Sequence, residues 1–272
     1  MIAFLLAAIL PTLAAGEADV SGAVKLAVPH VEFRFNQASA TSAPWIDANG
    51  WRILRKPDAS YYYDVPGAAA ELAAAEAFAY RANARIRTDA AGTEAFNKML
   101  QFLHGVPDLE LPAAANVGII DDGSDETSEV MNLMSRHNLL YRVVREPDPT
   151  LDLNVRLGTP DYPKSEAEDP GFLTQKIRAK LGDDKRLLRI YGSEVVIARL
   201  TANGDRARVH LLNFSRRHVL GLRVRVLGEY AKQKLYASDI ADPSLTDVVV
   251  GDGATEITLP DMTTYAIIDL SR

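Results

Sequence analysis

The feature that most constrains the fold is a change of periodicity along the chain. Up to Leu181, short apolar runs alternate with segments of helical spacing, whereas residues 187–270 read as one short strand after another. Strands that alternate with helices are typical of a parallel sheet, and regularly spaced short strands are typical of an antiparallel sandwich. The sequence therefore predicts an α/β fold, with a mostly parallel sheet flanked by helices, followed by a C-terminal antiparallel β-sandwich.

These patterns divide the chain into three expected segments. Residues 1–16 carry no charged side chain and end in small residues, which resembles a secretory signal without its basic start. A buried first strand or helix is the alternative, and the run is too short to span a bilayer. Residues 17–185 are expected to form the α/β domain and residues 186–272 the sandwich. We expect a secreted or periplasmic protein with no transmembrane segment.

Apolar spacing places the expected elements. Helices are expected at 67–83, 93–104, 126–137 and 170–181, and strands before the sandwich at 24–35, 116–120, 139–144 and 151–157. Asp169 and Pro170 open the last of these helices as N-cap and first residue. In the sandwich, strands are expected at 187–191, 194–201, 206–214, 219–227, 232–236, 246–250, 255–259 and 264–270. Residues 43–64 show no periodicity, so a loop is expected there.

Two stretches near the C-terminus carry a family resemblance. VHLLNFSRRHV at 209–219 and TEITLPDMTTYAIIDL at 255–270 look like the small β-sandwich that closes many glycoside hydrolases. The region before them resembles, more loosely, the glutamine-amidotransferase-like domain of trimeric β-galactosidases. The resemblance spans 116–270 and implies a carbohydrate partner and a homo-oligomer. The catalytic barrel of those enzymes needs about 250 residues of its own, which this chain does not have to spare.

Composition excludes several functions. The chain has no cysteine, which removes thiolate nucleophiles and thiolate metal sites. Its net charge of −6 argues against a nucleic-acid partner. Residues 201–228 contain six arginines and one acid. The alternation of Arg223 and Arg225 with valines predicts that these arginines lie on a solvated outer strand face. The five histidines show no metal-ligand spacing and no phosphate-binding loop is present, so no metal and no cofactor are expected.

The segment 45–55 has the chemistry of a sugar site. Sugars stack on aromatic rings and offer hydroxyls to planar polar groups, and this segment supplies both kinds of group. The candidate substrate-binding residues here are Trp45, Asn49, Trp51, Arg52 and Arg55, and the candidate catalytic residue is Asp47. The alternative is that the two tryptophans cover the edge of a core, with Arg52 stacked on one of them.

The acidic turn at 121–126 is the second candidate. It follows an apolar run and opens a helix, which is where open α/β sheets place ligands. Asp122 is the candidate catalytic carboxylate and Asp121 a candidate substrate contact. The alternative is capping, because acids in the first turn stabilise a helix by roughly 0.3–1 kcal/mol each. Capping accounts for Asp125 and Glu126 better than for the two aspartates.

Together these observations favour an exported, carbohydrate-related protein, either glycoside-hydrolase-like or a sugar-binding component. The alternative is a non-catalytic structural or oligomerisation module. If the protein is an enzyme, we expect a glycoside hydrolase that uses Asp47 and Asp122 as its paired carboxylates.

Overall fold

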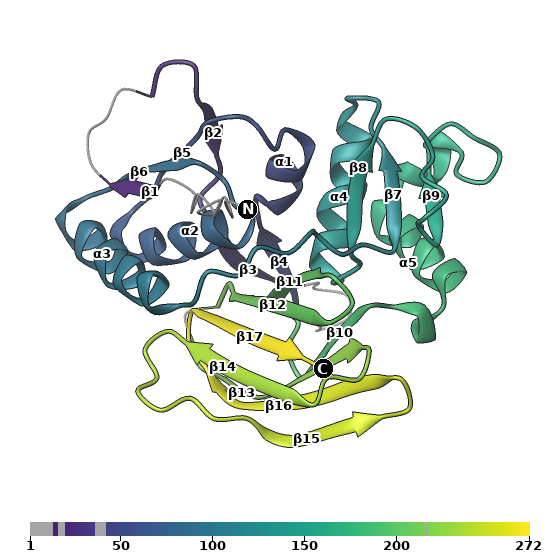
Figure 1. Cartoon of the computed structure of the whole chain (residues 1–272). Helices are drawn as coiled ribbons and strands as arrows, with labels where there is room; N and C mark the ends of the chain where they lie inside the picture. The colour runs from purple at the N-terminus through teal and green to yellow at the C-terminus, as the bar shows by residue number, and fades with distance from the viewer. Residues whose placement is uncertain (1–12, 16–19, 36–41, 216) are drawn as a thin grey trace, which may run out of the picture.

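The computed structural model describes residues 13–15, 20–35, 42–215 and 217–272. The chain forms two α/β units that lie side by side above an antiparallel sandwich (Figure 1). The predicted secretion signal, 1–16, lies outside the described residues except for β1 (Leu13–Ala15), which pairs with a strand of the first unit. Among the described segments, no helix is long and apolar enough to cross a membrane.

The first α/β unit is built on a four-stranded parallel sheet. Its order is β1, β6 (Ala84–Arg87), β5 (Tyr61–Asp64) and β2 (Val24–Leu26). The unit also contains α1 (Gly50–Arg55), α2 (Gly67–Ala79), α3 (Ala90–Gly105) and an antiparallel hairpin of β3 (His30–Phe35) and β4 (Ser42–Asp47). A Cβ atom at Gly92 would lie 2.8 Å from the Gly67 Cα. Helices α2 and α3 therefore approach each other closely at two glycines, which have no side chain.

The expectation of a loop at 43–64 was wrong, because this stretch contains most of β4 and the whole of α1 and β5. Tyr61 and Tyr63 point into the core and are fully buried, while Tyr62 between them is half-buried. Three identical residues in a row hide this alternation, because period two is normally recognised from a change of residue type.

The second α/β unit has its own parallel sheet, with β7 (Val117–Ile120) between β8 (Tyr141–Val144) and β9 (Leu153–Val155). Its helices are α4 (Asp125–Arg136) and α5 (Pro170–Leu181), with short 3₁₀ turns η1 (Lys164–Glu168) and η2 (Asp183–Lys185). The parallel strands therefore form two sheets, where the sequence predicted one.

The antiparallel C-terminal sheets are confirmed. One sheet has the order β10 (Leu188–Tyr191), β13 (Val219–Leu227), β16 (Ala254–Met262), β15 (Thr246–Gly251). The other has the order β11 (Val196–Ala202), β12 (Arg206–Asn213), β17 (Tyr265–Ser271), β14 (Lys232–Ala237). Leu222, Val224 and Val226 of β13 lie in the core between the sheets, and Arg223 points outward.

The sheet that contains β12 is covered on both faces. Its strand residues Leu212 and Tyr265 belong to the same buried cluster as the alanines of α2, whereas Val209 and Ile268 lie in the core between the two sheets. This explains why α2 is rich in alanine, since a helix lying against a sheet and inside a core needs small side chains on all sides.

Polar side chains join the parts. Asn138, just after α4, accepts from the Ala198 N–H (2.7 Å) and donates to the Val196 carbonyl (3.0 Å) of β11. Arg208 of β12 forms a two-bond ion pair with Asp269 (2.6 and 2.8 Å) and donates to the Pro107 carbonyl. Helix α5 ends at Leu181 and β10 begins at Leu188, but the division into folding domains at 185/186 stays a prediction.

Candidate ligand-binding site

The predicted tryptophan segment lies on β4 and α1, and its side chains contact other parts of the fold. The Arg136 guanidinium lies 4.5 Å from the centre of the Trp45 ring and donates to the Pro44 carbonyl. The Arg52 guanidinium lies 4.3 Å from the centre of the Trp51 ring and forms an ion pair with Asp47 (3.4 Å). Both tryptophans are half-buried and stacked on arginine.

Asn49 is buried in a polar cluster beneath α1. Its backbone N–H donates to Glu76 Oε1 (2.7 Å), and its side-chain amide donates to Glu76 Oε2 (2.8 Å). Its Oδ1 accepts from the Ala27 N–H (2.9 Å). Burial raises the pKa of Glu76 to about 7, although the donors from Asn49 and Tyr63 oppose this rise. These contacts position the start of α1 against α2.

Arg55 and Asp121 were both predicted as substrate contacts, and the structure brings them together. Arg55 donates to both carboxylate oxygens of Asp121 (2.6 Å each) and also to Ser128 Oγ and the Ser124 carbonyl. The hydrogen bond from Arg55 holds the pKa of Asp121 below its usual value. This ion pair fastens α1 of the first unit to the acidic turn of the second.

Asp122 lies at the start of α4. Its Oδ1 accepts from the Ser124 N–H (3.0 Å), the Ser124 hydroxyl (2.6 Å) and the Thr127 hydroxyl (2.8 Å). Partial burial raises the pKa of Asp122, but these hydrogen bonds outweigh burial and lower it to about 2. A carboxyl with this pKa is ionised at neutral pH and does not donate a proton. No hydrogen bond or ion pair joins it to Asp47 in the described parts of the chain. The catalytic role of both aspartates stays a prediction.

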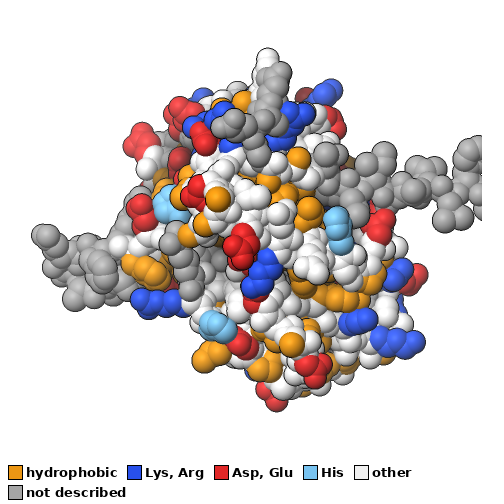
Figure 2. All heavy atoms as spheres, turned by 90° about the vertical axis from the view of Figure 1, so that its left-hand side faces the viewer, with side chains coloured by type: hydrophobic (Ala, Val, Ile, Leu, Met, Phe, Trp, Pro, Cys, Tyr) orange, Lys and Arg blue, Asp and Glu red, His pale blue; other side chains and the backbone are white. Residues whose placement is uncertain are grey.

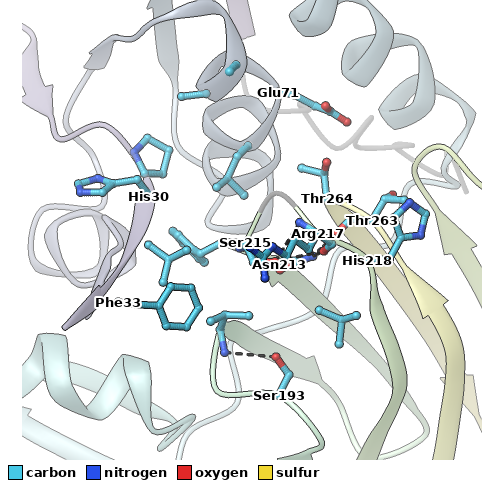
Figure 3. A pocket seen from close by; sticks show the side chains of 18 of the residues that line it. His30, Phe33, Glu71, Ser193, Asn213, Ser215, Arg217, His218, Thr263 and Thr264 are labelled. Carbon is cyan, nitrogen blue, oxygen red and sulfur yellow. Dashed lines mark hydrogen bonds between the residues drawn. The ribbon is translucent and has the colours of Figure 1, made fainter. Parts of the chain in front are cut away.

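A hollow of about 890 Å³ lies elsewhere, between the first unit and the sandwich (Figure 3). Its walls come from β3, α2, the β10–β11 turn, the β12–β13 turn and the β16–β17 turn. Among its lining residues are His30, Phe33, Glu71, Ser193, Asn213, Ser215, Arg217, His218, Thr263 and Thr264. This volume is within the range of small-molecule binding sites.

The walls of the hollow offer an aromatic ring and fixed polar groups. Phe33 is 51% exposed although it is a large hydrophobic side chain. Buried Asn213 donates to the carbonyls of Arg217 (2.9 Å) and Thr263 (2.6 Å), so its amide holds two of the turns that form the wall. His218 contacts both carboxylate oxygens of Asp261 (2.8 and 3.0 Å). Hydrogen bonds therefore fix the turns that carry these polar groups.

Glu71 carries the perturbed carboxyl group of this hollow. Burial, the charge of Asp239 and a hydrogen bond with Asp239 raise the pKa of Glu71 to about 7, while Thr264 and Lys98 lower it. Asp239 is in turn paired with Lys98 of α3. Glu71 and Asp239 also line a neighbouring hollow of about 710 Å³. The Glu71 carboxyl therefore lies at the junction of α2, α3 and the end of β14.

The sequence did hold a signal for this carboxyl. Glu71 and Glu76 are the acids of an otherwise apolar helix, GAAAELAAAEAFA, and an acid within a run of buried small residues needs a partner. The partners were not visible, because Asp239 and Thr264 lie more than 160 positions away in the chain. Within the described residues, no group of three or more His, Asp or Glu side chains is placed to hold a metal.

On the face of the molecule seen in Figure 2, acidic and basic side chains are interspersed among hydrophobic ones. Neither sign of charge forms one block on this face. A field that would steer a charged polymer is therefore not indicated there.

Comparison with known proteins gives a structural likeness only. No protein-family model matches the sequence, and no curated protein matches it. Among solved structures, α-L-fucosidase isoenzyme 2 from Paenibacillus thiaminolyticus superposes with a TM-score of 0.59 at 8% identity, over 79% of this chain and 61% of the fucosidase chain. A GH30 endoxylanase from Clostridium papyrosolvens matches 89% of this chain and 76% of its own at 10% identity, but its TM-score of 0.23 carries no argument. The chain thus spans about three fifths of the fucosidase, and over that length it shares the fold of a glycoside hydrolase.

Proposed function

We propose that this protein is a sugar-binding component of glycoside-hydrolase type and that the hollow between α2 and the sandwich is its binding site. The observation that carries the proposal is the exposed Phe33 ring on one wall, opposite turns that carry hydroxyl and guanidinium groups. An apolar ring face together with planar polar donors is the mixture that a sugar requires.

The fold likeness to an α-L-fucosidase supports a carbohydrate ligand. We also infer that the second unit is glutamine-amidotransferase-like, on the basis of its three parallel strands in the order β8, β7, β9 and the resemblance in sequence. Export, to the periplasm or the cell exterior, belongs to the same proposal.

Binding is favoured over hydrolysis by the geometry of the acids. Glycosidases hold their two carboxyls about 5–5.5 or 6.5–9.5 Å apart, whereas Glu71 and Asp239 are hydrogen-bonded to each other and so lie closer. Asp47 and Asp122 stay the predicted pair for a hydrolytic version of the proposal. Release of reducing sugar from oligosaccharides, lost in Asp122→Asn, would support that version over binding alone.

The test of the binding proposal is calorimetric titration with neutral sugars, including L-fucose and short oligosaccharides. Phe33→Ala should weaken binding by about two- to tenfold, since an aromatic stacking contact contributes roughly 0.5–1.5 kcal/mol. Phe172→Ala on α5 is the matched control, because Phe172 is similarly exposed (58%) and lies outside the hollow.

Wild-type affinity in Phe172→Ala together with weakened binding in Phe33→Ala would support the hollow as the site. Equal affinity in both variants, or no binding of any sugar by the wild type, would contradict the proposal. The second of these results would favour the structural or oligomerisation module.

A further inference from the structure

The outer face of the sheet β10-β13-β16-β15 carries arginines in neighbouring positions. The strand register places Arg189 of β10 directly opposite Arg225 of β13, and Tyr191 directly opposite Arg223. On the other side of β13, Arg225 lies opposite Glu256. Three guanidinium groups and one tyrosine ring therefore share one face of two adjacent strands.

The acids nearby do not balance these arginines. Glu256 serves two of them, since it pairs with Arg223 and lies 3.5 Å from Arg225 Nε. Among the acids that the structure describes, Arg189 pairs with Asp184 (3.4 Å), whose side chain is fully exposed. Its other terminal nitrogen donates to the Tyr191 hydroxyl (3.3 Å). An ion pair with a fully exposed partner contributes little in water.

Two nitrogens of this face lack a partner. Arg189 Nε and Arg225 Nη1 are buried and make no hydrogen bond with any residue that the structure describes. Like charges directly opposite each other across two strands are destabilising, and a buried donor without an acceptor costs further free energy. The sheet carries both costs at one place, although a neutral residue at either position would remove them.

We propose that this face is a second binding site, for the carboxylate of an acidic sugar. Arg223 is 53% exposed, and besides the Nη2 that binds Glu256 its planar guanidinium has further donors for a carboxylate. The side chains of Arg189 and Arg225 are less exposed (15% each) and add positive charge where water is partly excluded. Exposed Tyr191 beside them offers its ring to the apolar face of a pyranose.

The choice of a sugar as the carrier of the carboxylate rests on the proposed function, whereas the arginine site itself does not. A uronate unit suits the face because it combines a carboxylate with a ring that stacks. The site is distinct from the hollow, since none of Arg189, Arg223 and Arg225 lines the hollow.

The test compares trigalacturonate, a neutral galactose trisaccharide, and inorganic sulfate and phosphate, each titrated into the wild type and into Arg223→Gln, Arg206→Gln and Phe33→Ala. Arg223→Gln should weaken trigalacturonate binding about tenfold, because hydrogen bonds to charged groups are among the stronger contacts. Arg206→Gln is the matched control, since it removes the same charge from an exposed position on the other sheet. Thermal unfolding of each variant checks that the fold is kept.

Selective loss in Arg223→Gln, with neutral-sugar binding unchanged, supports the proposal. Equal loss in both arginine variants would mean a general charge effect and would overturn it. Inorganic sulfate or phosphate binding as tightly as trigalacturonate would also overturn it, because the site would then recognise an oxyanion without a sugar. Loss in Phe33→Ala and not in Arg223→Gln would place the uronate in the hollow, which overturns this site and leaves the proposed function intact.

Discussion

Two glutamates of one helix have very different surroundings. Glu76 is fully buried and accepts hydrogen bonds from Asn49 and Tyr63, so its carboxyl joins α2 to the start of α1 and to β5 inside the core. Glu71, five residues earlier, lines the hollow and is hydrogen-bonded to Asp239. For both residues burial is the main cause that raises the pKa to about 7.

The raised pKa of Glu71 predicts a pH effect on stability. The folded-state pKa is about 7 and the ordinary value is 4.5, so between these pH values the folded protein binds more protons than the unfolded chain. The contribution of Glu71 to the free energy of unfolding should therefore fall as pH rises from about 4.5 to 7. In Glu71→Gln this fall is absent, so the stability of the variant relative to the wild type should rise over that window.

Urea unfolding at several pH values between 4.5 and 8 measures this difference. Buried His210, whose pKa lies well below its usual value, has the opposite effect, but it is present in both proteins and cancels. Glu129→Gln, at an exposed position on α4, is the control for the loss of one glutamate carboxyl from a helix. A pH-independent difference for Glu71→Gln would contradict the raised pKa of Glu71.

At the scale of elements, the contact between α4 and β11 depends on one residue. Asn138 has a φ of 53°, in the left-handed region, and its amide makes two hydrogen bonds to the strand. Asparagine tolerates this conformation better than most residues. The side chain thus extends the hydrogen bonding of the strand to the end of a helix in another unit.

Asn138→Ala should lower the free energy of unfolding by roughly 2–4 kcal/mol, because it leaves a buried N–H unpaired and strains the backbone. Asn138→Gly should be less damaging than alanine by about 1 kcal/mol, because glycine accepts a positive φ. Chemical denaturation gives both values. If alanine and glycine variants are both as stable as the wild type, the contact does not hold these units together.

Element-scale features were predicted where they depend on local periodicity. The helix expected at 93–104 is the centre of α3, and the alternation of Val224 and Val226 with arginines correctly predicts the two faces of β13. Prediction failed where burial comes from the rest of the molecule. The strand β5 is the example. The strand expected at 206–214 is present as β12, and seven of its consecutive residues are buried because layers cover both of its faces.

The hollow could not be predicted either, because it also depends on packing between distant parts of the chain. The segment 45–55 and the turn at 121–126 were recognised by composition, and the structure does join them through Arg55 and Asp121. The hollow is instead assembled from residues near positions 30, 70, 193, 215 and 263. Only the packing of the first unit on the sandwich brings these together.

At the scale of the whole molecule, the three parts are linked by buried polar contacts, and the proposed sugar site lies where two of them meet. Arg199 and Arg208 of the sandwich donate to backbone carbonyls at Ala79 and Pro107, on either side of α3. These hydrogen bonds therefore fasten the first α/β unit, which forms one wall of the hollow, to the sandwich, which forms another. Self-association stays a prediction of the sequence resemblance, and sedimentation at micromolar concentration measures it.

The central claim is that a sugar binds in the hollow between α2 and the sandwich. Nuclear magnetic resonance titration of the labelled protein, with the sugar that gives the largest calorimetric signal, tests it residue by residue. The account predicts the largest backbone shift changes at Ser193, at residues 213–215 and 217–219, and at Thr263 and Thr264. Changes centred instead on residues 45–55 and on Asp121 and Asp122, with the hollow unaffected, would contradict it.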